Sequence, residues 1–235
     1  MNIQQFQNTN TNKIADSNQV EDPLTPILSN ILIPDSTIRS QAENQINLLV
    51  SQNFPHFLIS ISSKLSEENE KKEIRQLSAT LIKNLISNTN YIQQYLQIPS
   101  EKKQIIKNNI LSTLASPILE IRKAAALAVA GICKIELPLN QWDNIFDVLI
   151  NTTQNENLFI QLSSLTTLEY IYEKINIKDI NINIIAKLLN TYYSLLDNKD
   201  NNNELILTAL KSLINFYHLL VILCMNKIQQ KNFLI

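Results

Sequence analysis

The chain has 235 residues, of which 45% are hydrophobic and 17% charged, and its formal net charge is −1. This balance is typical of a globular chain, and it argues against nucleic acid as a partner, because phosphate binding needs a clustered excess of Lys and Arg. There is a single glycine. Phosphate-cradling loops and dinucleotide-binding turns need glycine where the backbone approaches the ligand, so the sequence predicts neither.

The pattern also gives no support for a metal site, a disulfide or a membrane anchor. Cys133 and Cys224 are far apart and indicate reduced core thiols, while His56 and His218 have no neighbouring ligand set. We therefore expect no metal and no cofactor. The longest apolar stretch, around Leu219–Met225, is too short to span a bilayer, so neither membrane insertion nor a secretory leader is expected.

The chain falls into three predicted parts. Residues 1–22 are rich in Asn, Gln and Thr, show no periodic apolar face, and are predicted to be a disordered extension. Residues 23–220 alternate apolar helical segments with short connections and are predicted to form one helical-repeat domain. Residues 221–235 lose the repeat pattern and are predicted to be an atypical tail.

The outer helices of this domain are marked mainly by proline and by capping residues. After the first helix, Pro34 breaks the chain, and Asp35 or Ser36 caps the next helix because its side-chain oxygen can accept amide protons of the first turn. Pro55 opens the second outer helix and Pro99 precedes the third. The fourth is expected to present Trp142, Ile145, Phe146 and Leu149. The fifth is expected to present Ile185, Leu188, Leu189 and Tyr192.

Five further stretches, the predicted inner helices, share one spacing of apolar and small residues. They start at Ile38, Ile74, Ile121, Ile160 and Ile206, with matching positions 4, 8 and 11 residues later. At about 100° per residue these offsets fall on one side of a helix. The starts are 36, 47, 39 and 46 residues apart (74−38, 121−74, 160−121, 206−160), the spacing of HEAT or armadillo helix pairs.

The predicted fold is therefore all-α, a right-handed α-α superhelix of about five helix pairs. No pair can bury its apolar stripe alone, so neighbouring pairs must stack into a continuous core. The positions at offsets 0 and 8 of the first four repeats are expected to be buried. They are Ile38, Ile46, Ile74, Ile82, Ile121, Val129, Ile160 and Leu168.

Three short segments stand at positions consistent with these repeats. They are Asn53–Leu58 (NFPHFL), Ala79–Asn84 (ATLIKN) and Glu136–Trp142 (ELPLNQW), the last interpreted as a helix end, a proline break, an Asn cap and an anchoring Trp. Read in order, they resemble the N-terminal part of the importin β family of nuclear transport receptors, most closely its importin β branch. The resemblance covers roughly residues 23–213, whereas family members resemble a much longer superhelix.

The resemblance implies a receptor for protein import into the nucleus, found in the cytoplasm, the nucleus and the nuclear pore. It implies binding of the GTPase Ran in its GTP form on the concave face, and of phenylalanine-glycine (FG) nucleoporin repeats between outer helices. Cargo or importin α would bind only if later repeats exist. No enzyme activity is expected, since Glu169 and Glu173 lack an acid–base partner. The alternative is a generic HEAT scaffold or adaptor, such as a phosphatase regulatory subunit.

Lys83 is the sharpest candidate for contacting Ran. It lies nine residues after Ile74, about 180° around the helix from that core position, so it is expected on the concave side. The resemblance makes it a Ran contact, while a solvated surface lysine is the alternative. Asn84 is a further candidate, or else a helix-bridging residue. Lys123 and Lys134, in the third repeat, share the outward face and are weaker Ran-binding candidates.

Two other sets of residues have both a structural and a functional interpretation. The resemblance makes Ile185, Leu188 and Leu189 candidates for an FG-repeat slot, whereas core packing is the alternative. An arginine follows the first core isoleucine in three repeats, and we expect it to pair with an acidic residue of the adjacent repeat. These arginines are Arg39, Arg75 and Arg122.

Overall fold

The computed structural model describes residues 23–232, with side-chain environments up to residue 222; the predicted extension 1–22 lies outside this range. Every regular element of the described part is helical, which confirms the all-α prediction. The α-helices are α2 (Leu24–Ile31), α3 (Ser36–Gln52), α4 (Phe54–Ser66), α5 (Lys72–Ser87), α6 (Thr89–Leu96), α7 (Ser100–Thr113), α8 (Leu119–Glu136), α9 (Ile145–Thr152), α10 (Leu158–Tyr172), α11 (Ile182–Asp197) and α12 (Asn203–Asn232). The 3₁₀ helices are η1 (Leu137–Leu139) and η2 (Ile177–Asp179).

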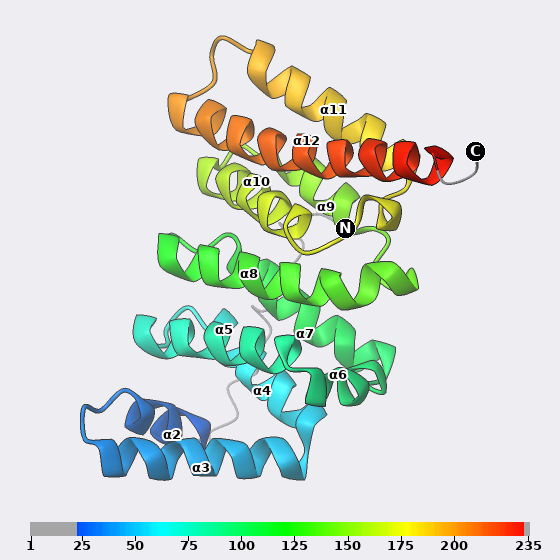
Figure 1. The fold of residues 1–235 in the computed structure, drawn as a ribbon. Helices are drawn as coiled ribbons and strands as arrows, with labels where there is room; N and C mark the ends of the chain where they lie inside the picture. The colour runs from blue at the N-terminus through cyan, green and yellow to red at the C-terminus, as the bar shows by residue number, and fades with distance from the viewer. Residues whose placement is uncertain (1–22, 233–235) are drawn as a thin grey trace. The chain divides into compact units, whose positions relative to one another are not determined.

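These helices form two compact units, and the division between them falls inside α8, after Ala128. In the first unit, α2 packs on α3 and α5, and α4 packs on α5 and α7. In the second, α10 packs on α9 and α12, and α11 packs on α12 and α9. Within each unit the pairs lie in successive layers (Figure 1). The pairs α2–α3, α4–α5, α7–α8, α9–α10 and α11–α12 are the five predicted ones, and α6 is an additional short helix that the pattern did not predict.

Asparagine and aspartate side chains fix where the helices start. The Asp35 carboxylate accepts two amide protons of the first turn of α3, at 2.8 and 3.1 Å, as predicted. Asn53, Asn88, Asn157 and Asn181 cap α4, α6, α10 and α11 in the same way. The short side-chain oxygen satisfies donors that the helix itself cannot. The abundance of asparagine in this chain therefore has a local structural use.

The first four inner helices bury the predicted stripe, with one exception. Seven of the eight residues expected in the core are buried, whereas Ile38 is 38% exposed. Ile38 lies in the first turn of α3, and the packed positions of that helix are Ala42, Ile46 and Val50, which lie further along it. The stripe of the first repeat therefore starts one turn later than the isoleucine alignment predicted.

The fifth inner helix is shifted by one residue from the predicted register. Of the predicted stripe on α12, Leu210, Ile214 and Tyr217 are 41%, 54% and 63% exposed. The buried positions are Leu205, Ala209, Ser212, Phe216 and Leu219. They also recur every three to four residues, but start one residue earlier. The alignment failed here because α12 carries two apolar stripes on nearly opposite sides, and only one of them packs on the rest of its unit.

α12 also extends past the predicted end of the repeat domain. It continues as one helix through Asn232, so the domain limit predicted after residue 220 falls inside it. By length and composition alone, Asn203–Ile222 could cross a membrane. Polar residues interrupt the apolar run of this segment. A packed core helix can have the same length and composition. Its contacts with α10 and α11 are those of a core helix on one side.

The Glu136–Trp142 segment makes the predicted break, but by different geometry. α8 ends at Glu136, η1 follows, and Asn140 takes a left-handed conformation with φ of 53°. Asn tolerates this conformation better than most residues other than glycine. Asn140 is therefore a turn residue rather than the predicted helix cap. Trp142 is buried, in agreement with its predicted role as an anchor.

Candidate binding surface on the inner helices

α5 is the helix that carries the sharpest candidate, and its packing fixes which side faces solvent. Ile74, Ala79, Ile82 and Ile86 are buried, and α5 packs against α4. The Ser78 hydroxyl donates to the Ile74 carbonyl at 2.8 Å, so this small polar residue is satisfied within its own helix. Because the buried residues recur every three to four positions, the opposite side of α5 is left open to a partner.

Arg75 ties α5 to the end of α4. Its side chain is 3% exposed, and its Nε donates a hydrogen bond to the Leu65 carbonyl at 2.9 Å. Burial lowers the pKa of this guanidinium, and the nearby charge of Glu68 acts in the opposite direction. The hydrogen-bond partner is thus a main-chain carbonyl of the same helix pair, not the predicted carboxylate of the adjacent repeat. A guanidinium suits this position because it can hold a fixed bond after losing water.

The arginine at the same position acts alike in the third repeat and differently in the first. Arg122 is buried, and its Nη1 donates to the Ser116 carbonyl at 2.7 Å, just before α8. Arg39 is exposed. Two of the three arginines therefore close the turn between the outer and the inner helix of their own pair, and the surface of the inner helix is left to other residues.

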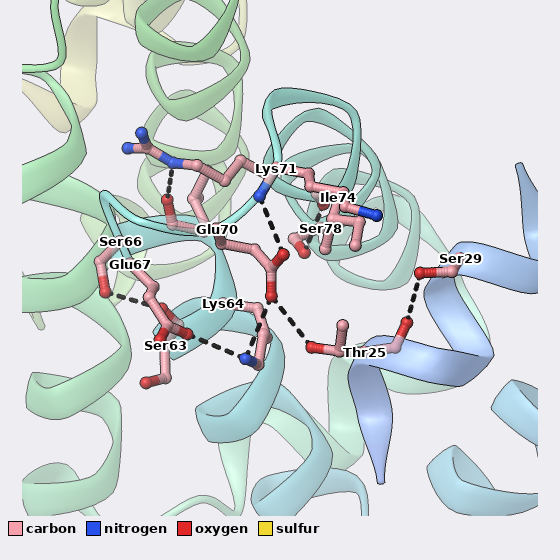
Figure 2. A network of polar contacts seen from close by, with 12 residues as sticks. Thr25, Ser29, Ser63, Lys64, Ser66, Glu67, Glu70, Lys71, Ile74 and Ser78 are labelled. Carbon is pink, nitrogen blue, oxygen red and sulfur yellow. Dashed lines mark hydrogen bonds and ion pairs between the residues drawn. The ribbon is translucent and has the colours of Figure 1, made fainter. Parts of the chain in front are cut away.

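A carboxylate, Glu70, organises the loop between α4 and α5 (Figure 2). One of its oxygens accepts from the Thr25 hydroxyl of α2 at 2.9 Å and from the Lys64 ammonium at 3.2 Å. The other accepts from the Lys71 main-chain N–H at 2.8 Å. Lys64 also pairs with Glu67 at 2.9 Å. This network joins α2, α4 and the start of α5, so it holds the first two helix pairs in register.

The Glu70 carboxyl is mostly buried, and burial alone would raise its pKa. Hydrogen bonds from the Lys71 N–H, from Thr25 and from Lys64, together with the charge of Lys64, outweigh burial and lower the pKa below its ordinary value. Each of these donors stabilises the ionised carboxylate. The network therefore requires the charged form of Glu70.

Lys83 and Asn84 lie on the side of α5 away from this network. Lys83 is half-buried and Asn84 is exposed, together with Thr80 and Ser87. Lys83 therefore flanks the open side rather than standing at its centre, because the core of α5 includes Ile82, next to it. Its stem is partly packed and its charge can reach solvent, which is the usual arrangement of a lysine beside apolar surface.

Lys123, on the first turns of α8, is exposed in the same unit. The starts of α5 and α8 are close, since the Lys72 ammonium lies 3.9 Å from the Glu120 carboxylate. Lys83 lies eleven residues beyond Lys72 (83−72) and Lys123 three beyond Glu120 (123−120), about 16 Å and about 5 Å along their helices. These lysines would thus contact different parts of a partner. Lys134 is exposed too, but it belongs to the second unit.

The three FG-repeat candidates on α11 do not share one surface. Leu188 is fully buried, Ile185 is half-buried and Leu189 is 45% exposed. Two exposed apolar neighbours were missed, Ile182 and Tyr193, at 72% and 71% exposure. Their spacing of three to four residues from Leu189 or Ile185 marks a second stripe on this helix, a signal that was present in the sequence.

The second unit contains a buried hydroxyl chain that the sequence did not reveal. The Tyr172 and Tyr192 hydroxyls lie 3.0 Å apart, and the Tyr192 hydroxyl lies 2.7 Å from that of Ser212. The Phe216 ring packs on both tyrosines, with centroid distances of 5.0 and 6.2 Å. Burial raises the pKa of Tyr172 well above its ordinary value and that of Tyr192 to about 12. These three linked hydroxyl groups stay uncharged and join α10, α11 and α12.

A cavity of about 470 Å³ lies beside this hydroxyl chain, between the end of α10 and α12. Its rim carries Glu173, Lys178 and His218, and the Glu173 carboxylate accepts from the Asn215 amide at 3.2 Å. Among residues 23–222, no three His, Cys, Asp or Glu side chains are grouped closely enough to hold a metal ion.

The sequence matches known proteins over most of its length. Residues 42–116 match the model of the importin-beta N-terminal domain. Importin subunit beta-1 of Saccharomyces cerevisiae is 36% identical over 155 residues, which are 62% of this chain and 18% of the relative. The chain spans about a fifth of the length of the curated relatives that it matches.

Solved structures of Kap95p, the yeast importin β, share the fold. One is a structure in which Kap95p binding induces the switch loops of RanGDP to adopt the GTP-bound conformation; it has a TM-score of 0.78 and 28% identity over 90% of this chain and 25% of Kap95p. The Kap95:Nup1 complex has a TM-score of 0.76 and 27% identity over 90% and 26%. The fold is that of the HEAT-repeat class. More narrowly, these matches are to the N-terminal region of the importin β family, which the sequence and the fold of this chain resemble.

Proposed function

We propose that this chain is the Ran-binding N-terminal region of a nuclear transport receptor, acting in protein import into the nucleus. It would work by binding, without chemistry, in the cytoplasm and the nucleus and at the nuclear pore. The observation that carries the proposal is the likeness over 90% of the chain to Kap95p in the structure that concerns Ran. In that structure Kap95p brings the switch loops of RanGDP into the GTP-bound conformation, so the form of Ran that already has this conformation, the GTP form, is the expected partner here.

The residues proposed for this contact are Lys83, Asn84 and Lys123 in the first unit, with Lys134 in the second. Lys83 is half-buried, so part of its side chain is already covered before a partner binds. Lys123 lies closer to the start of its helix and would meet a separate acidic group. Complementary charge of this kind guides association and sets register as well as adding affinity.

Nucleoporin binding is the second part of the proposal, and its support is the likeness to Kap95p in the Kap95:Nup1 complex. Of the residues suggested by sequence, Ile185 and Leu189 are accessible on α11, whereas Leu188 belongs to the core. An FG repeat would therefore meet the first two and not the third. Cargo or importin α would require repeats beyond the part described.

The test is calorimetric titration of the whole chain with Ran carrying a non-hydrolysable GTP analogue, and with Ran carrying GDP. We expect binding to the GTP form. Lys83→Ala should weaken it by about 2 kcal/mol, roughly thirtyfold, which is the loss expected for a partly buried charge pair. Lys102→Ala removes the same charge from an exposed position on α7 and is the matched control, with no expected effect.

Two results would exclude the proposal. The wild-type chain could fail to bind Ran, or it could prefer the GDP form. Either result would favour a generic HEAT scaffold, such as a phosphatase regulatory subunit. Equal losses of affinity in Lys83→Ala and Lys102→Ala would show that the chain binds Ran but that Lys83 does not mark the contact surface.

A further inference from the structure

Thr25, at the start of α2, lies in a sequence pattern that the proposed function does not use. In Pro23–Pro26 (PLTP), one proline follows the hydroxyl residue directly and another stands two positions before it. Protein kinases of the mitogen-activated class accept substrates with this pattern. Ser116 also precedes a proline, but it has no proline two positions before it. The pattern therefore singles out Thr25 as the acceptor for such a kinase.

The backbone at Thr25 favours the extended form in which protein kinases bind their substrates. The ring of a proline disfavours the helical conformation for the residue before it, and Thr25 stands before Pro26 inside the first turn of α2. No side chain caps this turn, and Pro26 has no N–H to lose when the turn opens. Thr25 is half-buried, whereas Pro23 and Pro26 are exposed. Opening of one turn at this helix end therefore presents the hydroxyl group to an enzyme.

Ser116 is in a closed environment by comparison. It is 2% exposed and lies in the turn between α7 and α8. Its hydroxyl oxygen accepts from the Ile118 N–H at 3.4 Å, and its carbonyl accepts from the Arg122 guanidinium at 2.7 Å. Presenting this hydroxyl to an enzyme would break the buried contacts of Arg122 as well. The chain thus contains an internal comparison between an accessible and a buried acceptor.

We propose that Thr25 is a phosphorylation site for a proline-directed protein kinase, and that its phosphate loosens α2 from the loop between α4 and α5. In the reaction a bond forms between the Thr25 Oγ1 and the γ-phosphorus of the kinase's nucleoside triphosphate. The bond from that phosphorus to its bridging oxygen breaks, and the nucleoside diphosphate leaves. The hydroxyl proton passes to the base of the kinase.

The hydroxyl group that would be modified belongs to the Glu70 network (Figure 2). Thr25 donates to one Glu70 oxygen at 2.9 Å, and the Lys64 ammonium donates to the same oxygen at 3.2 Å. Lys64 also pairs with Glu67 at 2.9 Å. Phosphorylation replaces the hydroxyl donor by acceptor oxygens and adds a charge of about −1.5 to −2. The single ammonium of Lys64 would then stand among three anionic groups, so the modified side chain and Glu70 repel each other.

The expected consequence is local. Leu24 and Leu28 are buried, and α2 packs on α3 and α5, so apolar contacts continue to hold α2 after the bond to Glu70 is lost. The phosphate should therefore make α2 open more often without unfolding the first unit. Because Glu70 connects α2 to the start of the second helix pair, modification of one hydroxyl group changes how firmly the first two pairs are joined.

Incubation of the whole 235-residue chain with a mitogen-activated protein kinase and ATP tests the assignment of the site. We expect peptide mass spectrometry to find the phosphate on Thr25, added at least about tenfold faster than on Ser116, whose hydroxyl needs a larger opening. Thr25→Ala should abolish this incorporation, and Ser116→Ala should leave it unchanged. Absence of phosphate from Thr25, or equal rates at Thr25 and Ser116, would overturn the inference.

Hydrogen exchange of the amides of Leu24–Ile31, with and without the phosphate, tests the consequence. The phosphorylated chain should exchange these amides about tenfold faster, the factor expected when a hydrogen bond to a charged group is lost. In Glu70→Gln the phosphate should accelerate exchange less, because no carboxylate opposes it. Unchanged exchange of α2 after phosphorylation would overturn the loosening. Equal acceleration in the wild type and in Glu70→Gln would overturn the assignment of the effect to Glu70.

Discussion

The two units satisfy their buried polar groups by different means. In the first unit, Arg75 and Glu70 are charged, and both act at the turn between α4 and α5. In the second, hydroxyl groups join helices to one another, as in the Tyr172–Tyr192–Ser212 chain and in the Thr152–Ser164 contact of 2.6 Å. The first arrangement fixes a turn and, through Thr25, ties it to the preceding helix pair, whereas the second joins helices directly through uncharged groups.

This difference has an energetic consequence. A buried charge is costly unless it keeps every partner, whereas a buried hydroxyl needs only one or two neutral partners. The tyrosine hydroxyls are protonated in neutral solution at their ordinary pKa of 10.0, and burial raises the pKa further, for Tyr192 to about 12. Protonation of Glu70 in acid should therefore weaken the first unit, and protonation of the tyrosines plays no part in the second. Trp142, the single tryptophan of the chain, is buried in the second unit and reports on that unit alone.

The largest expected effect lies in the second unit. Phe216→Ala removes the ring that packs on both tyrosines, and should lower the free energy of unfolding by about 3–5 kcal/mol, as for other buried aromatic residues. The measurement is urea unfolding followed by Trp142 fluorescence. Tyr217→Ala, at the next residue, is the control. It should change stability by no more than about 0.5 kcal/mol. If Tyr217→Ala lowered stability more than Phe216→Ala, the packed side of α12 would be the one predicted from Ile206.

The next largest effect on stability is expected in the first unit, where two arginines at the same repeat position differ in burial. Arg75→Ala leaves the Leu65 carbonyl without its donor in a buried place, and should cost about 1–3 kcal/mol. Arg39→Ala, at the same repeat position but exposed, should change stability by less than about 0.5 kcal/mol. Urea unfolding followed by circular dichroism checks both. Equal losses would show that the position, rather than burial of the guanidinium, sets the energy.

The sequence was sufficient for the fold but not for the surfaces. The three inner-helix stripes that start at Ile74, Ile121 and Ile160 could be predicted because a buried side imposes its spacing on the residues. The α12 register could not, since both of its sides are apolar and spacing alone does not say which one packs. The Leu65 partner of Arg75 also depends on where a turn brings a main-chain carbonyl, which no side-chain pattern records. The candidate lysines were placed on the correct helices, but Lys83 is half-buried because its neighbour Ile82 is in the core.

The smallest effect tests whether the first unit is the acid-sensitive one. The pKa of Glu70 is lowered on folding, so its ionised form stabilises the folded state. This contribution is complete above the ordinary value of 4.5 and is lost as the pH falls through the lowered pKa. Glu70→Gln keeps the size of the side chain but removes its charge. At neutral pH it should cost about 1 kcal/mol, because Lys64 keeps its pair with Glu67.

The informative quantity is the change of stability between neutral and acid solution. The wild-type chain should lose more stability below pH 4.5 than Glu70→Gln does, because the variant has no carboxylate to protonate at this position. Thr25→Val removes one donor to the same carboxylate, and should lower stability at neutral pH while keeping part of the acid sensitivity. Urea unfolding at both pH values, followed by circular dichroism, gives the difference, and Trp142 fluorescence gives the second unit separately. If wild type and Glu70→Gln lose equal stability in acid, the charge of Glu70 does not hold the first unit, and the contrast between the units rests on packing alone.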